Sequence, residues 1–190
     1  MQNSITTNGS YILRSITQTE FQLFTEEREL SGLAWGPHYL VHTPQQAPLR
    51  HGASIYIQSL HIESLQTMVD HRTTFANTLQ KVASWVGINP TQIARAYWHR
   101  LQKKEWVEPH QDLDSSRSSY FKRIKRFHVF PQLPDDFIVI MDSKLWHKQN
   151  QNSVSLSLVD FDFKQTHSYV NLANTSIEFL VIDFFLDLNL

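Results

Sequence analysis

The chain has 190 residues, 41% of them hydrophobic, and a formal net charge of −1, which fits one globular domain and excludes a disordered chain. Because there is no cysteine, disulfide bonds and thiolate ligands are excluded, so any bound metal ion must be held by His, Asp or Glu. The near-neutral charge, the polar start and the lack of a long apolar run favour a cytoplasmic protein with no nucleic-acid or membrane partner.

The first predicted elements are a helix and a strand. Residues 17–30 are predicted to form the helix, since Thr17 can cap it and Glu20, three residues further on, can complete a capping box. Residues 53–62 contain several β-branched and aromatic side chains and are predicted to form the strand.

A longer helix is predicted over residues 63–86, because apolar side chains recur there at spacings of three and four. The stripe comprises Leu65, Met68, Val69, Ala76, Leu79, Ala83 and Val86. Such a stripe is typical of a helix that packs on a sheet. Gly87 and Pro90 provide the expected end of this helix.

From residue 91 onward the chain changes to strand-like segments that are rich in β-branched and aromatic residues. They span residues 92–102, 121–130, 135–143, 153–163, 166–172 and 177–185. This pattern predicts a mainly β protein, a sandwich or jelly roll with helices packed outside. We expect a single domain over residues 1–190, in which residues 1–90 form a helical or mixed support for a β core in residues 91–190.

A candidate metal site lies in the sequence "PHQDLD". His110 and Asp112 are two residues apart, so in an extended segment they point to the same face. His167 offers a third ligand near the start of a late strand. Two histidines and one carboxylate form the facial triad that holds Fe(II) and leaves other coordination positions open. The short motif alone equally fits a solvated turn; the third ligand and the absence of cysteine favour the metal site.

The chain also resembles a known family over about residues 92–187. The resemblance is carried by "ARAYWHRLQKKEWVEPHQD", "KRFHVF", "FIVIMDSKLW" and "LVDFDFKQTHSYVNLANTSIEFLVIDFF". In the order of these motifs the chain is similar to the aspartyl/asparaginyl β-hydroxylase-like branch of the Fe(II)/2-oxoglutarate oxygenases. The resemblance implies a double-stranded β-helix, a jelly roll of the cupin-like kind. It also implies that His110 and His167 are metal ligands and that Arg126 and His128 bind the cosubstrate carboxylate next to the iron.

Two positions depart from the family pattern. Asp112 completes a triad that the founding β-hydroxylases lack. Ile177 stands about where the family has an arginine that clamps the distal carboxylate of 2-oxoglutarate. Because a buried carboxylate needs a polar or charged partner, either another group replaces the arginine or 2-oxoglutarate is not the cosubstrate. We expect His99, on a neighbouring strand, to be the replacement.

The expected function is therefore an Fe(II)- and 2-oxoglutarate-dependent oxygenase that uses dioxygen to hydroxylate an unactivated C–H bond of an amino acid, a small metabolite or a peptide. Trp98 and Trp106 are candidates to line the substrate pocket, and Asp183 is expected in a turn or at a strand edge. Two alternatives stay open, since the missing arginine suits both. One is an iron oxygenase on the same scaffold that does not use 2-oxoglutarate, and the other is a non-catalytic jelly-roll binding module.

Overall fold

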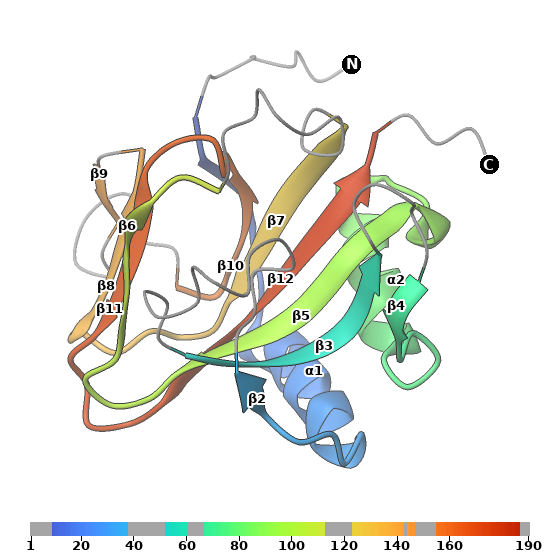
Figure 1. Cartoon of the computed structure of the whole chain (residues 1–190), viewed down its shortest axis with the longest axis horizontal. Helices are drawn as coiled ribbons and strands as arrows, with labels where there is room; N and C mark the ends of the chain where they lie inside the picture. Colours follow the sequence, from blue (N-terminus) through green and yellow to red (C-terminus); the bar gives the residue numbers. More distant parts are fainter. Residues whose placement is uncertain are drawn as a thin grey trace.

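The computed structural model describes residues 9–37, 52–60, 67–112, 123–142, 144–146 and 155–186. Two antiparallel sheets face each other, and two helices lie behind the larger sheet (Figure 1). Neither helix in these ranges has the length and apolarity needed to cross a lipid bilayer.

The larger sheet has eight strands, and seven of them follow the order β1-β10-β7-β12-β5-β3-β2, with β4 paired to β3. Their bounds are β1 Tyr11–Ser15, β2 Gly36–Pro37, β3 Ala53–Leu60, β4 Thr67–Asp70, β5 Ile93–Leu101, β7 Ile124–Phe130, β10 Ser157–Phe161 and β12 Ile177–Phe185. The smaller sheet has the order β6-β11-β8-β9. Its strands are β6 Trp106–His110, β8 Phe137–Met141, β9 Lys144–Trp146 and β11 His167–Asn171. The helices are α1 Gln18–Leu30, α2 Ala76–Val86 and the 3₁₀ turn η2 Pro90–Gln92.

The strands from β5 to β12 form a jelly roll. Along the chain they alternate between the sheets, with β5, β7, β10 and β12 in the larger one and β6, β8, β9 and β11 in the smaller one. Strands that are distant in sequence thereby become neighbours, as β5 and β12 do. The predicted double-stranded β-helix is confirmed. The N-terminal part contributes strands as well as helices, because β1 to β4 extend the larger sheet.

Two hydrophobic clusters hold these layers together. One lies between the sheets, and the other lies between the larger sheet and the helices. The alternation of side chains along β12 supplies both, since Phe179 and Val181 join the inner cluster while Leu180 and Ile182 join the outer one. Phe179 and Val181 therefore point into the interior of the jelly roll, and Leu180 and Ile182 point toward the helices.

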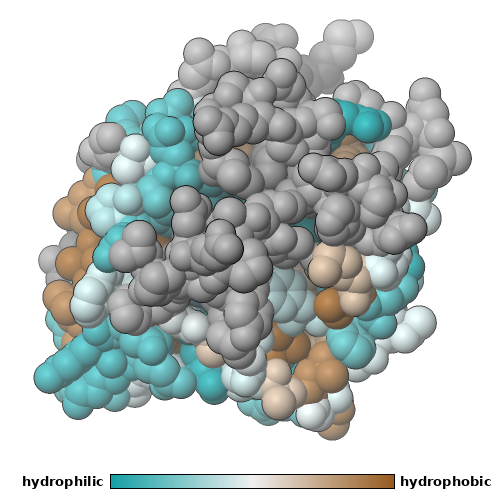
Figure 2. All heavy atoms as spheres, viewed as in Figure 1, coloured by the Kyte–Doolittle hydropathy of each residue, from teal (hydrophilic) through white to brown (hydrophobic). Residues whose placement is uncertain are grey.

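The outward face of the smaller sheet is apolar. Its side chains include exposed Trp106 and Leu145 and the half-buried Ile138, Ile140 and Val170. Apolar residues also appear along the side of the molecule where this sheet lies in Figure 1 (Figure 2). In the parts of the chain that the structure describes, no helix covers this face.

The N-terminal elements test the sequence-based predictions directly. The Thr17–Glu20 capping box at the start of α1 is present, as predicted. The strand predicted over residues 53–62 is observed as Ala53–Leu60, and the two remaining residues lie outside the described ranges. The helix predicted over residues 63–86 is wrong in its first half, because Thr67–Asp70 form β4 and the helix begins only at Ala76. Its predicted end at Gly87 is confirmed by a left-handed C-cap.

The start of α2 depends on a residue from another helix. Phe75 at the N-cap position makes no side-chain capping bond. Instead, the carboxylate of Glu27 on α1 accepts hydrogen bonds from the backbone N–H groups of Asn77, at 3.1 Å, and Thr78, at 2.8 Å. The first turn of α2 is thus capped across the helix pair, where a negative charge also suits the helix dipole.

We predict that Glu27→Ala lowers the free energy of unfolding by about 1 kcal/mol, the usual cost of a lost helix cap. The matched control is Glu26→Ala, because Glu26 is exposed and its carboxylate bonds to Gln22 within the same helix. Urea denaturation of both variants measures the difference. Equal losses in the two variants would contradict the cross-helix cap.

Candidate metal centre

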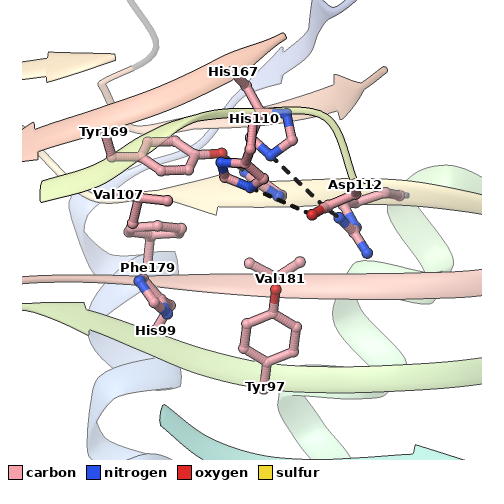
Figure 3. A pocket seen from close by; sticks show the side chains of 11 residues that line it. Tyr97, His99, Val107, His110, Asp112, His167, Tyr169, Phe179 and Val181 are labelled. Atoms are coloured by element: carbon pink, nitrogen blue, oxygen red, sulfur yellow. Dashed lines mark hydrogen bonds and ion pairs between the residues drawn. The ribbon is translucent and has the colours of Figure 1, made fainter. Parts of the chain in front are cut away.

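A cavity opens between the two sheets in the interior of the jelly roll. Side chains from both sheets line it, as Figure 3 shows. They are Tyr97, His99, Val107, His110, Asp112, Arg126, His128, His167, Tyr169, Phe179 and Val181. The cavity thus collects six of the eight residues that the sequence pointed to.

The pairing of β6 with β11 brings the three candidate ligands together. His110 ends β6, His167 begins β11, and the two are directly opposite each other in the register, with ring centroids 4.1 Å apart. Asp112 follows two residues after His110, where its N–H donates to the carbonyl of Phe163. One ligand atom from each of the three residues can be chosen so that all lie within 4.8 Å of one another. The imidazoles of both histidines point toward Asp112 (Figure 3).

Backbone contacts orient both imidazole rings. Nδ1 of His110 lies 2.5 Å from the carbonyl oxygen of Glu108, and Nδ1 of His167 lies 3.0 Å from that of Gln165. Because a carbonyl only accepts, each Nδ1 carries a proton, and in a neutral ring Nε2 is then the atom with the lone pair. These Nε2 atoms lie 3.4 Å and 3.7 Å from the two carboxylate oxygens of Asp112. Burial lowers the pKa of His167 to about 4, so its imidazole is neutral at pH 7. The donor set fits a divalent metal ion.

A buried cluster of charges adjoins the three ligands. The guanidinium of Arg126 donates from Nε and Nη2 to Asp183, at 2.6 Å and 3.0 Å, and from Nη1 to Asp112. Arg95 donates to Asp183 as well, at 3.0 Å from Nε. The three residues form one rung across β5, β12 and β7, because Asp183 is directly opposite both arginines. The expected turn or edge position of Asp183 is therefore wrong, since it is fully buried in a central strand.

The ion pairs decide the charge states in this cluster. Burial by itself would raise the pKa of Asp183, but Arg126 and Arg95 outweigh it and lower that pKa. Burial likewise acts to lower the pKa of Arg126, yet Asp183 and Asp112 hold it well above its ordinary value. All three nitrogens of the Arg126 guanidinium thus contact carboxylates of the protein. These contacts use three of the five N–H donors of Arg126, and the expected contact of this residue with a cosubstrate carboxylate stays a prediction.

Two further histidines line the cavity. The ring of His128 stacks on Phe161, with centroids 4.1 Å apart, and its Nδ1 lies 3.1 Å from the hydroxyl of Tyr169. Burial, together with the charge of Arg126, holds the pKa of His128 well below its ordinary value. Its Nε2 is buried and has no hydrogen-bond partner among the described residues. A buried polar atom of this kind usually contacts a ligand or an ordered water.

His99 lies on the same inner face, on β5. Its Nδ1 is 3.3 Å from the hydroxyl of Ser54, and its ring packs against Phe179. Gly52 lies against the other edge of the ring, where a Cβ atom would come within 2.9 Å of Cε1 and Nε2. Glycine is therefore required at position 52 for the ring to keep this position.

The position of the missing arginine is apolar. Ile177 is buried and is directly opposite Leu101 on β5. Its neighbour Glu178 is 3.0 Å from Arg28, which lies on α1 at the other side of the sheet. Among the described residues that line the cavity, Arg126 is the only permanently charged cation.

The two tryptophans predicted to line the pocket do not do so. Trp98 is fully buried on the outer face of β5, edge to face with Phe21 of α1. It cannot share the cavity with His99, because adjacent residues on a strand point to opposite faces. Trp106 is 44% exposed, and its neighbour Val107 lines the cavity instead.

The phase of β6 explains the position of Trp106. The register of β6 and β11 pairs His110 with His167 but Val107 with Tyr169, so the stretch between them contains a β-bulge. The three-residue step from His110 to Val107 therefore matches the two-residue step from His167 to Tyr169. Strict alternation from His110 would place Trp106 inside, but the bulge reverses the faces, so Val107 points into the cavity and Trp106 points outward. Tyr97 and Tyr169, in contrast, lie two residues from His99 and His167, and alternation would have found both of them.

Comparisons with known proteins support the fold. No family model and no curated protein matches the sequence. Solved structures do match. A prolyl hydroxylase from Trichoplax adhaerens, in complex with a hypoxia inducible factor oxygen degradation domain peptide fragment, is similar at 12% identity with a TM-score of 0.61, over 96% of this chain and 86% of that one. A 2OG-Fe(II) oxygenase family oxidoreductase from Burkholderia pseudomallei is similar at 14% identity with a TM-score of 0.57. The match covers 93% of this chain and 85% of that one.

A prolyl-4-hydroxylase from Pseudomonas putida is also similar, at 11% identity with a TM-score of 0.55, over 93% of this chain and 90% of that one. Each of these matches spans nearly the whole of both chains. The fold is thus the one that these 2-oxoglutarate/Fe(II) oxygenases have. The chain combines it with a His-Asp-His donor set in the interior of the jelly roll.

We predict that Asp183→Asn lowers the free energy of unfolding at pH 7 by about 3–5 kcal/mol, because it leaves two buried arginines without their carboxylate. The lowered pKa of Asp183 means that its stabilisation is complete above the ordinary aspartate pKa of about 4 and is lost as the pH falls below that value. Chemical denaturation between pH 3 and pH 8 measures both effects. A loss below about 1 kcal/mol at pH 7 would contradict a structural role for this cluster.

Proposed function

We propose that this protein is a non-heme Fe(II)-dependent oxygenase that holds its metal through His110, Asp112 and His167. The observation that carries the proposal is the convergence of two imidazole Nε2 atoms and one carboxylate in the interior of the jelly roll. Two neutral imidazoles and one carboxylate are the donor set of non-heme Fe(II) oxygenases. The fold supports the same class.

The side chains around the metal centre would have separate roles. The three ligands would hold a metal ion from one side, and the remaining coordination positions would be available to a chelating acid and dioxygen. Fe(II) bound there would supply the one-electron and dioxygen chemistry that protein side chains lack. The apolar and aromatic walls, which include Val107, Phe179 and Val181, would exclude bulk water from the reacting groups.

We propose 2-oxoglutarate as the cosubstrate, bound toward His128 and His99. The unpartnered Nε2 of His128 supports this placement, because a ligand in the cavity would satisfy it. Since Tyr169 can donate to Nδ1 of His128, Nε2 can carry the proton and donate to an oxygen of the acid. An iron oxygenase that does not use 2-oxoglutarate is the second candidate, and the apolar surroundings of Ile177 favour it.

The narrower assignment and the substrate are also proposals. The order of His110, the Arg126–His128 strand and His167 supports the aspartyl/asparaginyl β-hydroxylase-like branch, whereas the similar solved structures named above include two prolyl hydroxylases. We propose a C–H hydroxylation of an amino acid, a small metabolite or a peptide. The peptide is included because the Trichoplax adhaerens enzyme was solved with a peptide fragment.

We predict that the purified protein binds one Fe(II) or Co(II) per chain. His110→Ala and His167→Ala should abolish binding, and Asp112→Ala should weaken it severely, because each removes one of only three protein ligands. Anaerobic titration followed by calorimetry measures the affinity. His71→Ala is the matched control, since His71 lies just before α2 and does not line the cavity. Undiminished binding in both histidine variants would refute the metal site.

We predict that 2-oxoglutarate binds to the Fe(II) protein and that His99→Ala and His128→Ala each weaken it. If His99 anchors the distal carboxylate, binding must weaken as pH rises through neutrality, because an imidazole with an ordinary pKa of about 6.5 loses its proton there. The visible charge-transfer band of the chelate measures the affinity between pH 6 and pH 9. A flat profile with a defect only in His128→Ala would reassign the anchor to His128. No chelate at any pH, with iron bound, would favour the second candidate function.

A further inference from the structure

We propose that Arg126 is a positioning residue that restricts Asp112 to binding the metal through one oxygen, and thereby keeps a third coordination position open. The proposal rests on the proposed metal centre and concerns how the chain controls it. This role is separate from the cosubstrate contact that the sequence suggested for this arginine.

The geometry of Asp112 is the first support. Its Oδ1 lies 3.4 Å from Nε2 of His110, and its Oδ2 lies 3.7 Å from Nε2 of His167. Both oxygens therefore border the point on which the imidazoles converge. A carboxylate in that position can bind a metal ion with one oxygen or with both. Nothing in the placement of the two histidines selects between these modes.

The contact of Arg126 with Asp112 makes the selection. Nη1 of Arg126 donates to Oδ2, while Oδ1 faces His110. A charge-assisted hydrogen bond draws electron density from Oδ2 and fixes the plane of the carboxylate. Oδ1 is left as the stronger donor toward the metal. Asp112 then occupies one position, so the triad leaves three positions open, two for a chelating acid and one for dioxygen.

The rest of the charge cluster holds Arg126 in this position. Asp183 receives both Nε and Nη2, which fixes the orientation of the guanidinium and leaves Nη1 directed at Asp112. Arg95 in turn shares the carboxylate of Asp183. Arg126 is only 1% exposed and sits in the middle of β7, so it has little freedom to follow a shift of Asp112. A lysine could not span both carboxylates in this way.

The test compares Arg126→Gln with Arg95→Gln, after loading with Co(II). Arg126→Gln leaves Asp183 paired with Arg95, so it creates no isolated charge at Asp183. Arg95→Gln removes a cation from the same cluster without touching Asp112, and it controls for general loss of charge and stability. Crystal structures and the infrared carboxylate stretches report whether Asp112 binds with one oxygen or two. We expect one oxygen in the wild type and in Arg95→Gln, and two in Arg126→Gln.

A second measurement counts the open positions. In the anaerobic Fe(II) protein saturated with oxalate, which fills two positions, nitric oxide is an uncharged probe of the third. We expect its affinity to fall about 10- to 100-fold in Arg126→Gln, the range usual for lost outer-sphere partners, and to stay unchanged in Arg95→Gln. Because the probe has no charge, a loss of this kind does not report a missing ion pair between Arg126 and a ligand.

The outcomes separate the two proposals. Single-oxygen binding in Arg126→Gln with unchanged nitric oxide affinity overturns the positioning role and leaves the metal centre standing. Two-oxygen binding in the wild type overturns it as well, and that measurement holds even if Arg126→Gln does not fold. A wild-type protein that binds neither Co(II) nor Fe(II) overturns the proposed function itself.

Discussion

The candidate site depends on one register, the pairing of His110 on β6 directly with His167 on β11. Neither strand brings the three candidate ligands together alone, because His167 lies more than fifty residues after His110 and Asp112. A slip of one residue in either strand would turn its histidine away from the cavity. The bulge between His110 and Val107 sets this register locally. It turns the imidazole and Val107 to the same cavity while Trp106 faces outward.

Beside this register, the molecule buries two arginines and two aspartates in contact with one another, Arg95 and Arg126 with Asp112 and Asp183. The four charges sum to zero, which makes their burial tolerable but gives no strong reason for stability alone, since a buried ion pair often adds little over an apolar pair. The position of the cluster gives a better reason. It ends on Asp112, the carboxylate of the candidate metal site, which follows two residues after the last residue of β6. A rigid part of the larger sheet thus contacts a candidate ligand at the end of the smaller sheet.

The opposite end of the cavity has another character. Phe179 lines it, and the polar groups there are the imidazole of His128, the hydroxyl of Tyr169 and the ring of His99, which contacts Ser54. These groups can offer directed hydrogen bonds, whereas Arg126 is the only permanently charged cation among the described residues that line the cavity. The two ends of the cavity thus differ in the kind of polar group that lines them. Ion pairs lie next to the candidate metal ligands, and hydrogen-bonding groups lie at the other end, where the proposed cosubstrate would extend.

Sequence alone indicated a sandwich or jelly roll and the pair His110 and Asp112, because strand periodicity and the spacing of these two residues are local properties of the chain. The resemblance of motif order to a known family added the double-stranded β-helix and supported His167 as the third candidate ligand. The sequence also identified the C-cap of α2 and the capping box of α1, which involve residues close in sequence. Tertiary structure decided the rest. Alternation shows which residues share a face but not which face is interior, and a bulge resets it, so Trp98 and Trp106 were misplaced. The start of α2 is capped by Glu27, which lies fifty residues before Asn77 in the sequence. The contact between Arg126 and Asp183 likewise requires the pairing of β7 with β12, which the sequence does not show.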